Sequence, residues 1–178
     1  GLLGQDYPRA KYEIIIVDDG SSDATVRIVR RMTAKRNVRL LKLPSSPVET
    51  TGRKPDAISL GIQKSRGEVI ATTDADCQVP ATWVRTMIAN LSPDVAFLSG
   101  PVVEKSDGSV LGRLASLEFL GLITTGAGLI GLGRPINCSG ANLLYRKSAF
   151  KAVNGFGNGE SSCDDETLMQ RIFQRNIG

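Results

Sequence analysis

The sequence predicts an α/β fold, in which a mostly parallel, doubly wound sheet carries helices on both faces and forms a three-layer αβα sandwich. Apolar runs of strand length alternate with helix-like segments through residue 103, which is the pattern of repeated βαβ units. The first run, YEIIIVD at residues 12–18, is apolar and β-branched, as expected of a central parallel strand. With 178 residues, of which 41% are hydrophobic, the chain is predicted to be a single domain around one core.

The predicted elements follow from the spacing of apolar residues and from the residues at element ends. Gly20 permits a turn and Ser22 or Asp23 can cap the first helix, while Pro80 stands at the start of the third. Residues 1–11 are expected to be the end of a helix and a loop. The predicted strands are residues 12–18, 38–43, 69–71, 95–103 and 142–145. The predicted helices begin near residues 24, 56, 80, 147 and 164.

Acidic residues gather where predicted elements begin or end: Asp18 with Asp19, Asp74 with Asp76, and Asp164 with Asp165 and Glu166. The first two groups follow strands, and ligands of parallel α/β sheets bind beyond the carboxyl ends of the strands. Alternate residues of an extended chain face the same way, so Asp74 and Asp76 can share one cation. An acidic turn explains any one group, but three groups together indicate a ligand site.

The third acidic group opens a predicted helix. The helix dipole favours acidic residues there by about 0.3–1 kcal/mol each, and one acid would satisfy it. Three adjacent acids repel one another, which is expected to raise the pKa of at least one member. Since a carboxylate with a raised pKa suits proton abstraction near neutral pH, this group supplies the candidate general base.

The chain contains no histidine. This excludes Ser-His-Asp and Cys-His catalysis and leaves carboxylates, lysines, tyrosines or thiolates as candidate bases. A bound metal is expected to be a hard cation with oxygen ligands. The three cysteines, Cys77, Cys138 and Cys163, are odd in number and too widely spaced for a zinc knuckle, which favours a reducing compartment.

The net charge of +4 does not predict nucleic-acid binding. The basic cluster is interpreted as a solvated helix face. None of the five Phe, three Tyr and one Trp residues interleaves with this cluster, as base stacking would require. The cluster consists of Arg27, Arg30, Arg31, Lys35 and Arg36.

Residues 110–133 form a long apolar segment with a single acid, Glu118. Residues 119–133 carry no charge and include five glycines, and this run of 15 residues is too short to span a bilayer. We expect a helix packed under the site, with the glycines admitting close contact. The alternative is a helix that lies at a membrane interface.

Four segments, taken in order, carry a resemblance to a known family: IIIVDDGSSD, GRKPDAISLGI, GEVIATTDADC and CDDETL. They resemble the family 2 inverting glycosyltransferases, which have the Rossmann-like GT-A fold, and the resemblance covers nearly the whole chain. It implies transfer of a sugar from a nucleotide diphosphate donor, with a UDP-sugar expected first, to a hydroxyl of a glycan or lipid-linked acceptor. It also implies a Mg²⁺ or Mn²⁺ cofactor and cytoplasmic chemistry, with attachment to the membrane left open.

The resemblance also bears on the extent of the domain. The family's first strand would precede residue 1, and the QxxRW-like motif of processive members is absent from the 178 residues. We therefore expect a single GT-A catalytic domain over residues 1–178, truncated at the N-terminus and also at the C-terminus.

Roles for individual residues are implied by the same resemblance. Asp19, with Asp18 beside it, matches the carboxylate that accepts hydrogen bonds from the nucleotide base. Lys54 matches the lysine that lines the nucleotide pocket. Asp74 matches the first acid of the DxD motif, which contacts the ribose and helps to place the metal, and Asp76 matches the acid that ligates the metal.

The resemblance places the catalytic base at Asp165, which aligns with the aspartate of the family's ED signature. Because Asp-Asp stands where the family more often has Glu-Asp, Asp164 is the alternative base. A base on the face opposite the leaving diphosphate gives inversion without a covalent intermediate. Segments that line the donor sugar and acceptor, where small residues allow close approach, are matched by Gly100, Gly140 and Asn142.

Two other functions share parts of the pattern. A sugar-phosphate nucleotidyltransferase has a similar sheet and metal-binding acids, but it needs a Gly-rich, Arg-bearing loop that this sequence does not contain. A receiver domain, a signalling module phosphorylated on aspartate, also has an IIIVDDG-like segment. It would use Asp74 or Asp76 as the acceptor and Lys105 as the contacting lysine, but no proline follows Lys105 and the chain after it is too long.

Overall fold

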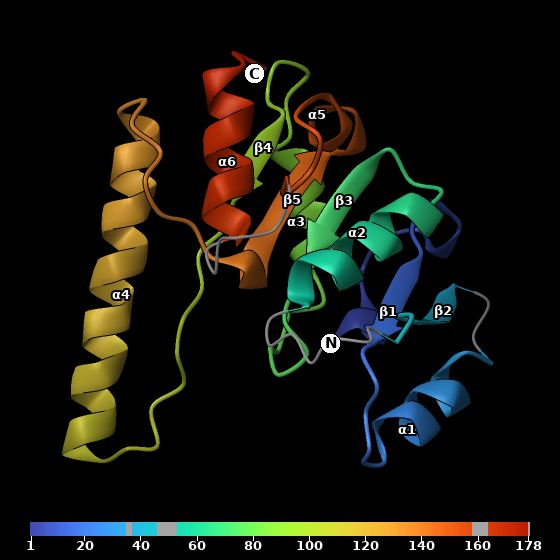
Figure 1. The fold of residues 1–178 in the computed structure, drawn as a ribbon. Coiled ribbons are helices and arrows are strands. Elements are labelled where there is room, and N and C mark those ends of the chain that lie inside the picture. Colours follow the sequence, from blue (N-terminus) through green and yellow to red (C-terminus); the bar gives the residue numbers. More distant parts are fainter. Residues whose placement is uncertain (35–36, 46–52, 158–163, 178) are drawn as a thin grey trace.

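The computed structural model describes residues 1–34, 37–45, 53–157 and 164–177, so Lys35, Arg36 and Cys163 lie outside it. The strands form two hydrogen-bonded sheets (Figure 1). In the first, β1 (Ile14–Asp18) and β2 (Val38–Lys42) pair in parallel. In the second, β5 (Leu143–Arg146) lies between β3 (Val69–Thr72) and β4 (Phe97–Ser99) and runs antiparallel to both.

The direction of β5 is the exception to the predicted parallel arrangement. β3 and β4 are parallel to each other, because each is antiparallel to β5. After β4 the chain forms α4 (Val110–Gly131) and then returns to the end of β4, where the Gly100 amide donates to the Asn142 carbonyl at 2.8 Å. β5 therefore starts where β4 ends and runs back alongside it.

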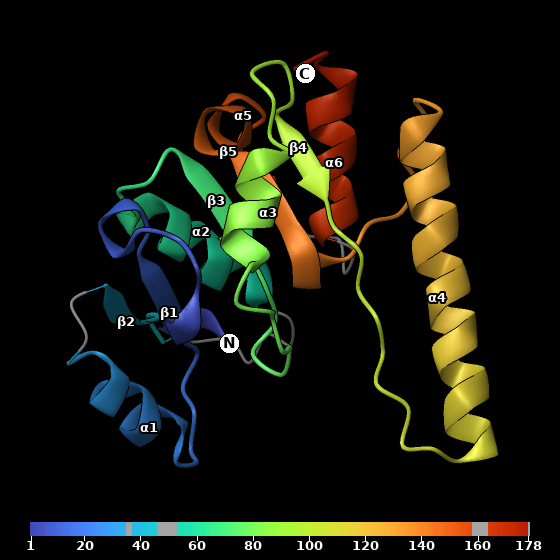
Figure 2. The same cartoon turned by 180° about the vertical axis from the view of Figure 1, so that it is seen from behind.

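Helices cover both faces of the three-stranded sheet, which gives the predicted three layers. α2 (Lys54–Lys64), α5 (Lys147–Ala152) and α6 (Asp164–Gln174) lie on one face, and α3 (Trp83–Ala89) lies on the other (Figures 1 and 2). β5 separates two core clusters. Leu143 and Tyr145 pack in the cluster of α5 and α6, whereas Leu144 packs with Trp83 and Met87 of α3, which is the two-residue period of a strand buried on both sides.

Several element ends differ from the predicted ones. α2 starts at Lys54, earlier than predicted, because Pro55 is tolerated in the first turn of a helix. β4 is shorter than residues 95–103, since Pro101 has no N–H to continue a ladder. Residues 1–11 contain two 3₁₀ turns, Leu2–Gly4 and Arg9–Lys11. α1 (Thr25–Met32) forms as predicted.

The predicted packing of residues 110–133 is wrong. The segment forms α4, a continuous helix of 22 residues that is long and apolar enough, by length and composition, to cross a membrane. Gly126 is its one buried residue, and α4 stands apart from both sheets (Figures 1 and 2). One glycine does admit a close contact, because a Cβ on Gly126 would lie 2.8 Å from the Asn137 carbonyl oxygen.

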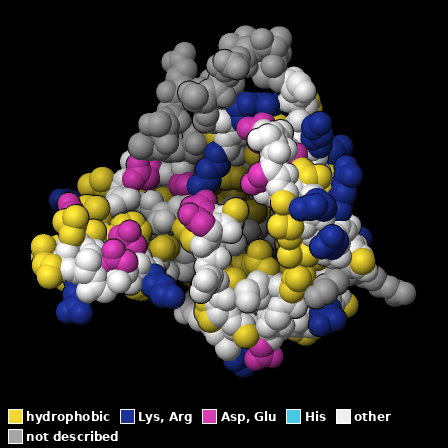
Figure 3. Space-filling view, turned by 90° about the horizontal axis from the view of Figure 1, so that it is seen from below, with side chains coloured by type: hydrophobic (Ala, Val, Ile, Leu, Met, Phe, Trp, Pro, Cys, Tyr) yellow, Lys and Arg dark blue, Asp and Glu magenta, His cyan; other side chains and the backbone are white. Residues whose placement is uncertain are grey.

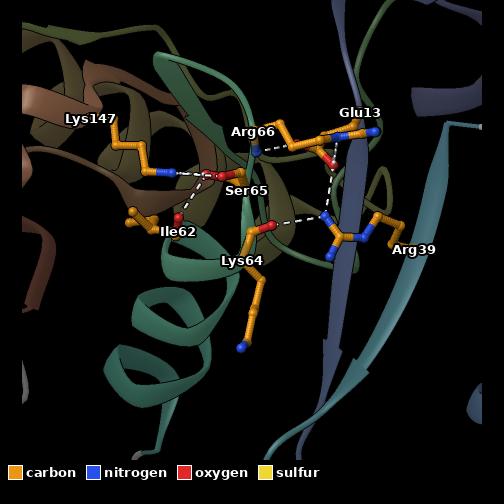
Figure 4. Close-up of polar contacts among 7 residues, drawn as sticks. All are labelled: Glu13, Arg39, Ile62, Lys64, Ser65, Arg66 and Lys147. Carbon is orange, nitrogen blue, oxygen red and sulfur yellow. Dashed lines mark hydrogen bonds and ion pairs between the residues drawn. The ribbon is translucent and has the colours of Figure 1, made fainter.

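A polar network joins the two sheets (Figure 4). Glu13, which precedes β1, accepts hydrogen bonds from the Arg66 backbone N–H at 2.6 Å and from Arg39 Nη1 of β2 at 3.0 Å. At the same loop, Lys147 Nζ of α5 donates to the Ser65 carbonyl at 2.7 Å. The loop between α2 and β3 is thus tied both to the β1–β2 pair and to the three-stranded sheet.

Glu13→Gln is expected to destabilise the fold by roughly 1–3 kcal/mol, because a carboxylate that is 10% exposed loses its ion pairs with Arg39 and Arg66. The matched control is Asp6→Asn, which removes an exposed ion pair with Arg85 and is expected to cost less than about 1 kcal/mol. Urea unfolding measures both changes. Equal costs would contradict the role given to Glu13.

The contribution of Glu13 to stability also depends on pH. Burial alone would raise the pKa of the Glu13 carboxyl, but the hydrogen bonds from Arg66 and Arg39 and their charges lower it below its ordinary value of 4.5. With a lowered folded-state pKa, the stabilisation is present above the unfolded pKa and is lost as the pH falls through the folded pKa. The unfolding free energy of the wild type should therefore fall more steeply below pH 4.5 than that of Glu13→Gln.

Candidate active site

The two acids at the end of β1 face different surroundings. Asp18 is 8% exposed, and its carboxylate accepts from the Ser21 N–H at 3.1 Å. Hydrogen bonds from the Ser21 side chain and backbone hold the pKa of Asp18 below its ordinary value. The Asp19 side chain is 40% exposed and pairs with Arg53 Nη1 at 2.7 Å. Asp18 therefore closes the turn, while Asp19 presents its carboxylate outward.

Lys54 joins the second and third acidic groups. Its Nζ lies 2.7 Å from Asp74 Oδ1 and 3.9 Å from Asp165 Oδ2. Arg53, the partner of Asp19, is the preceding residue. The N-terminal end of α2 thus brings together Asp19, Asp74 and Asp165, which come from three distant parts of the sequence.

Asp74, Asp76 and Cys77 form a group that could hold a metal ion. One ligand atom of each residue lies within 4.8 Å of the others, and the Cys77 N–H donates to the Asp74 carbonyl at 3.2 Å in the turn after β3. Two carboxylates and a thiol fit a divalent cation. The sequence analysis identified the two acids but not Cys77, although its position directly after Asp76 in TDADC was the available signal.

Asp165 lies in the first turn of α6, with a side chain that is 19% exposed. A Cβ on Gly140 would overlap the Asp165 carboxylate, so a side chain at this position would force the carboxylate to move. The Thr72 hydroxyl of β3 donates to the Gly140 carbonyl at 3.1 Å and fixes its position. Asp164 begins α6, but its side chain lies outside the described part of the structure.

Gly100 and Asn142 form a second close contact. A Cβ on Gly100 would lie 2.3 Å from Asn142 Nδ2. The Asn142 amide donates to the Pro101 carbonyl and accepts from Trp83 Nε1, both at 2.8 Å. Asn142 therefore holds the end of β4 against α3, two residues from Gly140.

Two other titratable groups near Asp165 stay protonated at neutral pH. Burial, followed by the charges of Asp165 and Glu166, raises the pKa of Cys138 to about 12. Burial, followed by the charge of Asp165, also raises the pKa of Tyr145 well above its ordinary value. Neither Cys138 nor Tyr145 is therefore a candidate general base.

The view from below shows acidic side chains with lysine or arginine side chains between them, beside the residues drawn grey (Figure 3). The described residues of the three acidic groups lie together because the carboxyl ends of β1 and β3 and the start of α6 meet at one edge of the fold.

This combination of fold and acidic site defines a glycosyltransferase domain of the GT-A type. The fold is similar to that of the mannosyltransferase PcManGT from Pyrobaculum calidifontis, solved in complex with GDP-Man and Mn²⁺. The TM-score is 0.68 and the identity 21%, over 96% of this chain and 45% of that chain. The chain belongs to glycosyl transferase family 2, whose family model matches residues 1–153.

Two relatives match most of this chain. Poly-beta-1,6-N-acetyl-D-glucosamine synthase of Staphylococcus epidermidis is 29% identical over 157 residues, which cover 85% of this chain and 36% of the relative. Dodecaprenyl-phosphate galacturonate synthase of Rhizobium johnstonii is 30% identical over 158 residues, which cover 85% of this chain and 43% of the relative. The chain thus spans less than half the length of either relative.

Family membership confirms the resemblance seen in the sequence, and the GT-A fold agrees with the predicted αβα arrangement. Membership of glycosyl transferase family 2 favours neither of the two alternatives, a receiver domain or a nucleotidyltransferase. Lys105, the lysine that a receiver would need, is exposed in the connection between β4 and α4.

Proposed function

We propose that this chain is the catalytic domain of a metal-dependent, inverting glycosyltransferase that uses a nucleotide diphosphate sugar. The observation that carries the proposal is the Lys54 ammonium, 2.7 Å from Asp74 and 3.9 Å from Asp165. Through this contact, Asp74 after β3 and Asp165 in the first turn of α6 belong to one site. One small ligand could then contact the candidate cation site at Asp74, the Lys54 ammonium and the candidate base Asp165 together.

The donor nucleotide is proposed to bind between Asp19 and Asp74, whose side chains are each 40% exposed. Asp19 accepts hydrogen bonds from the base, with Asp18 holding the turn, and Lys54 lines the pocket. Asp74 contacts the ribose. The GDP-Man complex of PcManGT supports a nucleotide sugar as the ligand class, and a UDP-sugar is the first donor to test.

Asp76 and Asp74 would hold Mg²⁺ or Mn²⁺, which when bound offsets the charge of the leaving diphosphate. The two carboxylates are hard oxygen donors that suit either ion. Cys77 adds a softer donor within the same group, which favours Mn²⁺ over Mg²⁺.

Asp165 is proposed to take the proton of the acceptor hydroxyl, with Asp164 as the alternative. Gly140 leaves the space into which the Asp165 carboxylate projects. A base that removes this proton, on the face opposite the leaving diphosphate, gives inversion in one step. Gly100 and Asn142 then border the pocket for the donor sugar and acceptor.

The acceptor is proposed to be a hydroxyl of a glycan or of a lipid-linked group. The names of the two relatives contain one of each kind, a poly-N-acetylglucosamine and a dodecaprenyl phosphate. We also propose that the reaction takes place in the cytoplasm, where activated donors are made.

Calorimetric titration of the chain with UDP-, GDP- and dTDP-sugars, with Mn²⁺ and with EDTA, tests the proposal. One nucleotide sugar is expected to bind in Mn²⁺ and much more weakly in EDTA, and NMR of the product should show an inverted anomeric configuration. Metal-independent binding or a retained configuration would contradict it. Pyrophosphate release from a nucleoside triphosphate and a sugar phosphate would indicate a nucleotidyltransferase instead.

Gly140→Ala is expected to lower turnover roughly 10²-fold, because the new methyl group occupies the position of Asp165 Oδ2. Donor affinity should change little, since the Asp74 and Asp76 group is not displaced. Gly4→Ala is the matched control, because a Cβ there meets no atom within 4 Å. Steady-state kinetics and calorimetry measure the two quantities, and an unchanged kcat in Gly140→Ala would count against Asp165 as the base.

A further inference from the structure

The outer surface of α4 is apolar to a degree unusual for a solvent-facing helix. Five of its leucines are between 45% and 78% exposed. At 3.6 residues per turn, they are spread over roughly 200° around the helix, an arc that also holds the exposed Glu118. The apolar stripe of a helix that packs on one partner is only about 100° wide. Lipid that surrounds half of the helix would cover these leucines better than a single neighbouring helix or strand. The five residues are Leu111, Leu114, Leu117, Leu120 and Leu122.

The connections of α4 exclude a simple membrane span. Its two flanking segments leave the sheet at one point, where the Gly100 amide is bonded to the Asn142 carbonyl at 2.8 Å. If α4 crossed a bilayer, residues 132–141 would have to return through hydrocarbon as irregular backbone, with polar groups that lipid cannot satisfy. A helix that lies in the plane of the membrane surface leaves both connections on the side of the domain.

Cations flank the apolar part of α4. Arg113 lies in its first turn and Arg134 follows its last, and both are exposed. Glu118 is the only charged residue between them. Arginines at the two ends of an apolar helix can extend to phosphate groups while the leucines enter the acyl region, and each adds attraction to anionic lipid.

The far end of α4 is close to the candidate active site along the chain. Gly140 is the sixth residue after Arg134, a reach of at most about 20 Å, and Gly140 borders the Asp165 carboxylate. A helix bound to a membrane would therefore hold this carboxylate near the lipid surface.

From the exposed arc, the connections and the flanking arginines, we propose that α4 binds in the plane of an anionic phospholipid bilayer and holds the active site at its surface. The consequence for catalysis, access to a lipid-borne acceptor, rests on the proposed function, but the binding itself does not. The partner is the bilayer rather than a protein.

Flotation of the chain with vesicles tests the binding without any substrate. The chain is expected to float with vesicles of phosphatidylcholine and phosphatidylglycerol, and less with phosphatidylcholine alone. The double variant Leu114→Glu/Leu122→Glu should lower the partition coefficient at least about tenfold, since two leucines that would be buried in the acyl region become charged. Arg113→Gln and Arg134→Gln should each lower it roughly fivefold, only with the anionic vesicles.

The matched control is Ile28→Glu, which changes a residue of α1 that is 48% exposed and should leave flotation unchanged. Circular dichroism checks the fold of each variant, and calorimetry with the donor, without vesicles, separates this proposal from the proposed function. Absence of flotation would overturn the proposal. So would a dimer, seen by sedimentation, that Leu114→Glu/Leu122→Glu dissociates without any effect on flotation, because a second copy would then cover α4.

Discussion

Asp165→Asn is expected to lower turnover roughly 10²–10⁴-fold and to leave donor affinity nearly unchanged. Asparagine keeps the size of the side chain and so still fits against Gly140, where an added Cβ would overlap the side chain of residue 165. The amide cannot accept the proton of an acceptor hydroxyl. Steady-state kinetics measure the first effect, and calorimetry with the donor and Mn²⁺ measures the second.

Two variants decide whether Asp165 is the base. Asp164→Asn changes the alternative base, and Glu166→Gln changes a third acid of the same helix turn. Both are expected to retain most of the activity. If Asp164→Asn loses as much turnover as Asp165→Asn, or if Asp165→Asn loses donor affinity as severely as Asp76→Ala, the assignment of the base is wrong.

Asp76→Ala should abolish the effect of metal on donor binding. Asp76 supplies one of the two carboxylates in the group with Asp74 and Cys77, and a divalent cation stabilises a transferring diphosphate by several kcal/mol. The donor affinity of this variant in Mn²⁺ is expected to fall about 10²-fold, to the value that the wild type shows in EDTA. Calorimetry in both solutions measures the difference.

Cys77→Ser serves as the control for Asp76→Ala. It replaces sulfur by oxygen in the same group, so binding supported by Mg²⁺ should persist, whereas affinity for the softer ion Cd²⁺ should fall. A Cys77→Ser variant that lost Mg²⁺-supported binding as completely as Asp76→Ala would show that the thiol is needed to shape the turn.

The grouping of the acids could be predicted because it follows from a general property of parallel strands. Asp19 and Asp74 each come after an apolar run, and the carboxyl ends of such strands share an edge. The contacts between them could not be predicted. The spacing of Arg53 from Asp19 and of Lys54 from Asp74, at 2.7 Å in both pairs, depends on where α2 begins, and local sequence places helix ends only approximately.

Two features of the fold could not be predicted for different reasons. β5 reads as a short apolar strand whichever way it runs. It runs antiparallel because the chain, after α4, returns to the sheet at the end of β4, where Gly100 and Asn142 are hydrogen-bonded. The composition of α4 does not show what surrounds it, because a largely apolar helix suits both a protein core and lipid. The glycines of residues 119–133 favoured the core, and the exposed leucines of the structure show otherwise.

The polar network at Glu13 links two parts of the domain, the β1–β2 pair and the three-stranded sheet with its helices. These two parts are not equally stable. Among the described residues, both principal apolar clusters are built around β5, and neither includes a residue of β1 or β2. Segments with few buried apolar contacts open at lower free energy than the rest of a fold. Transient detachment of the β1–β2 unit would carry Asp19 away from Asp74 while leaving Asp76 and Asp165 in place, so the residue proposed to contact the nucleotide base belongs to the less stable unit.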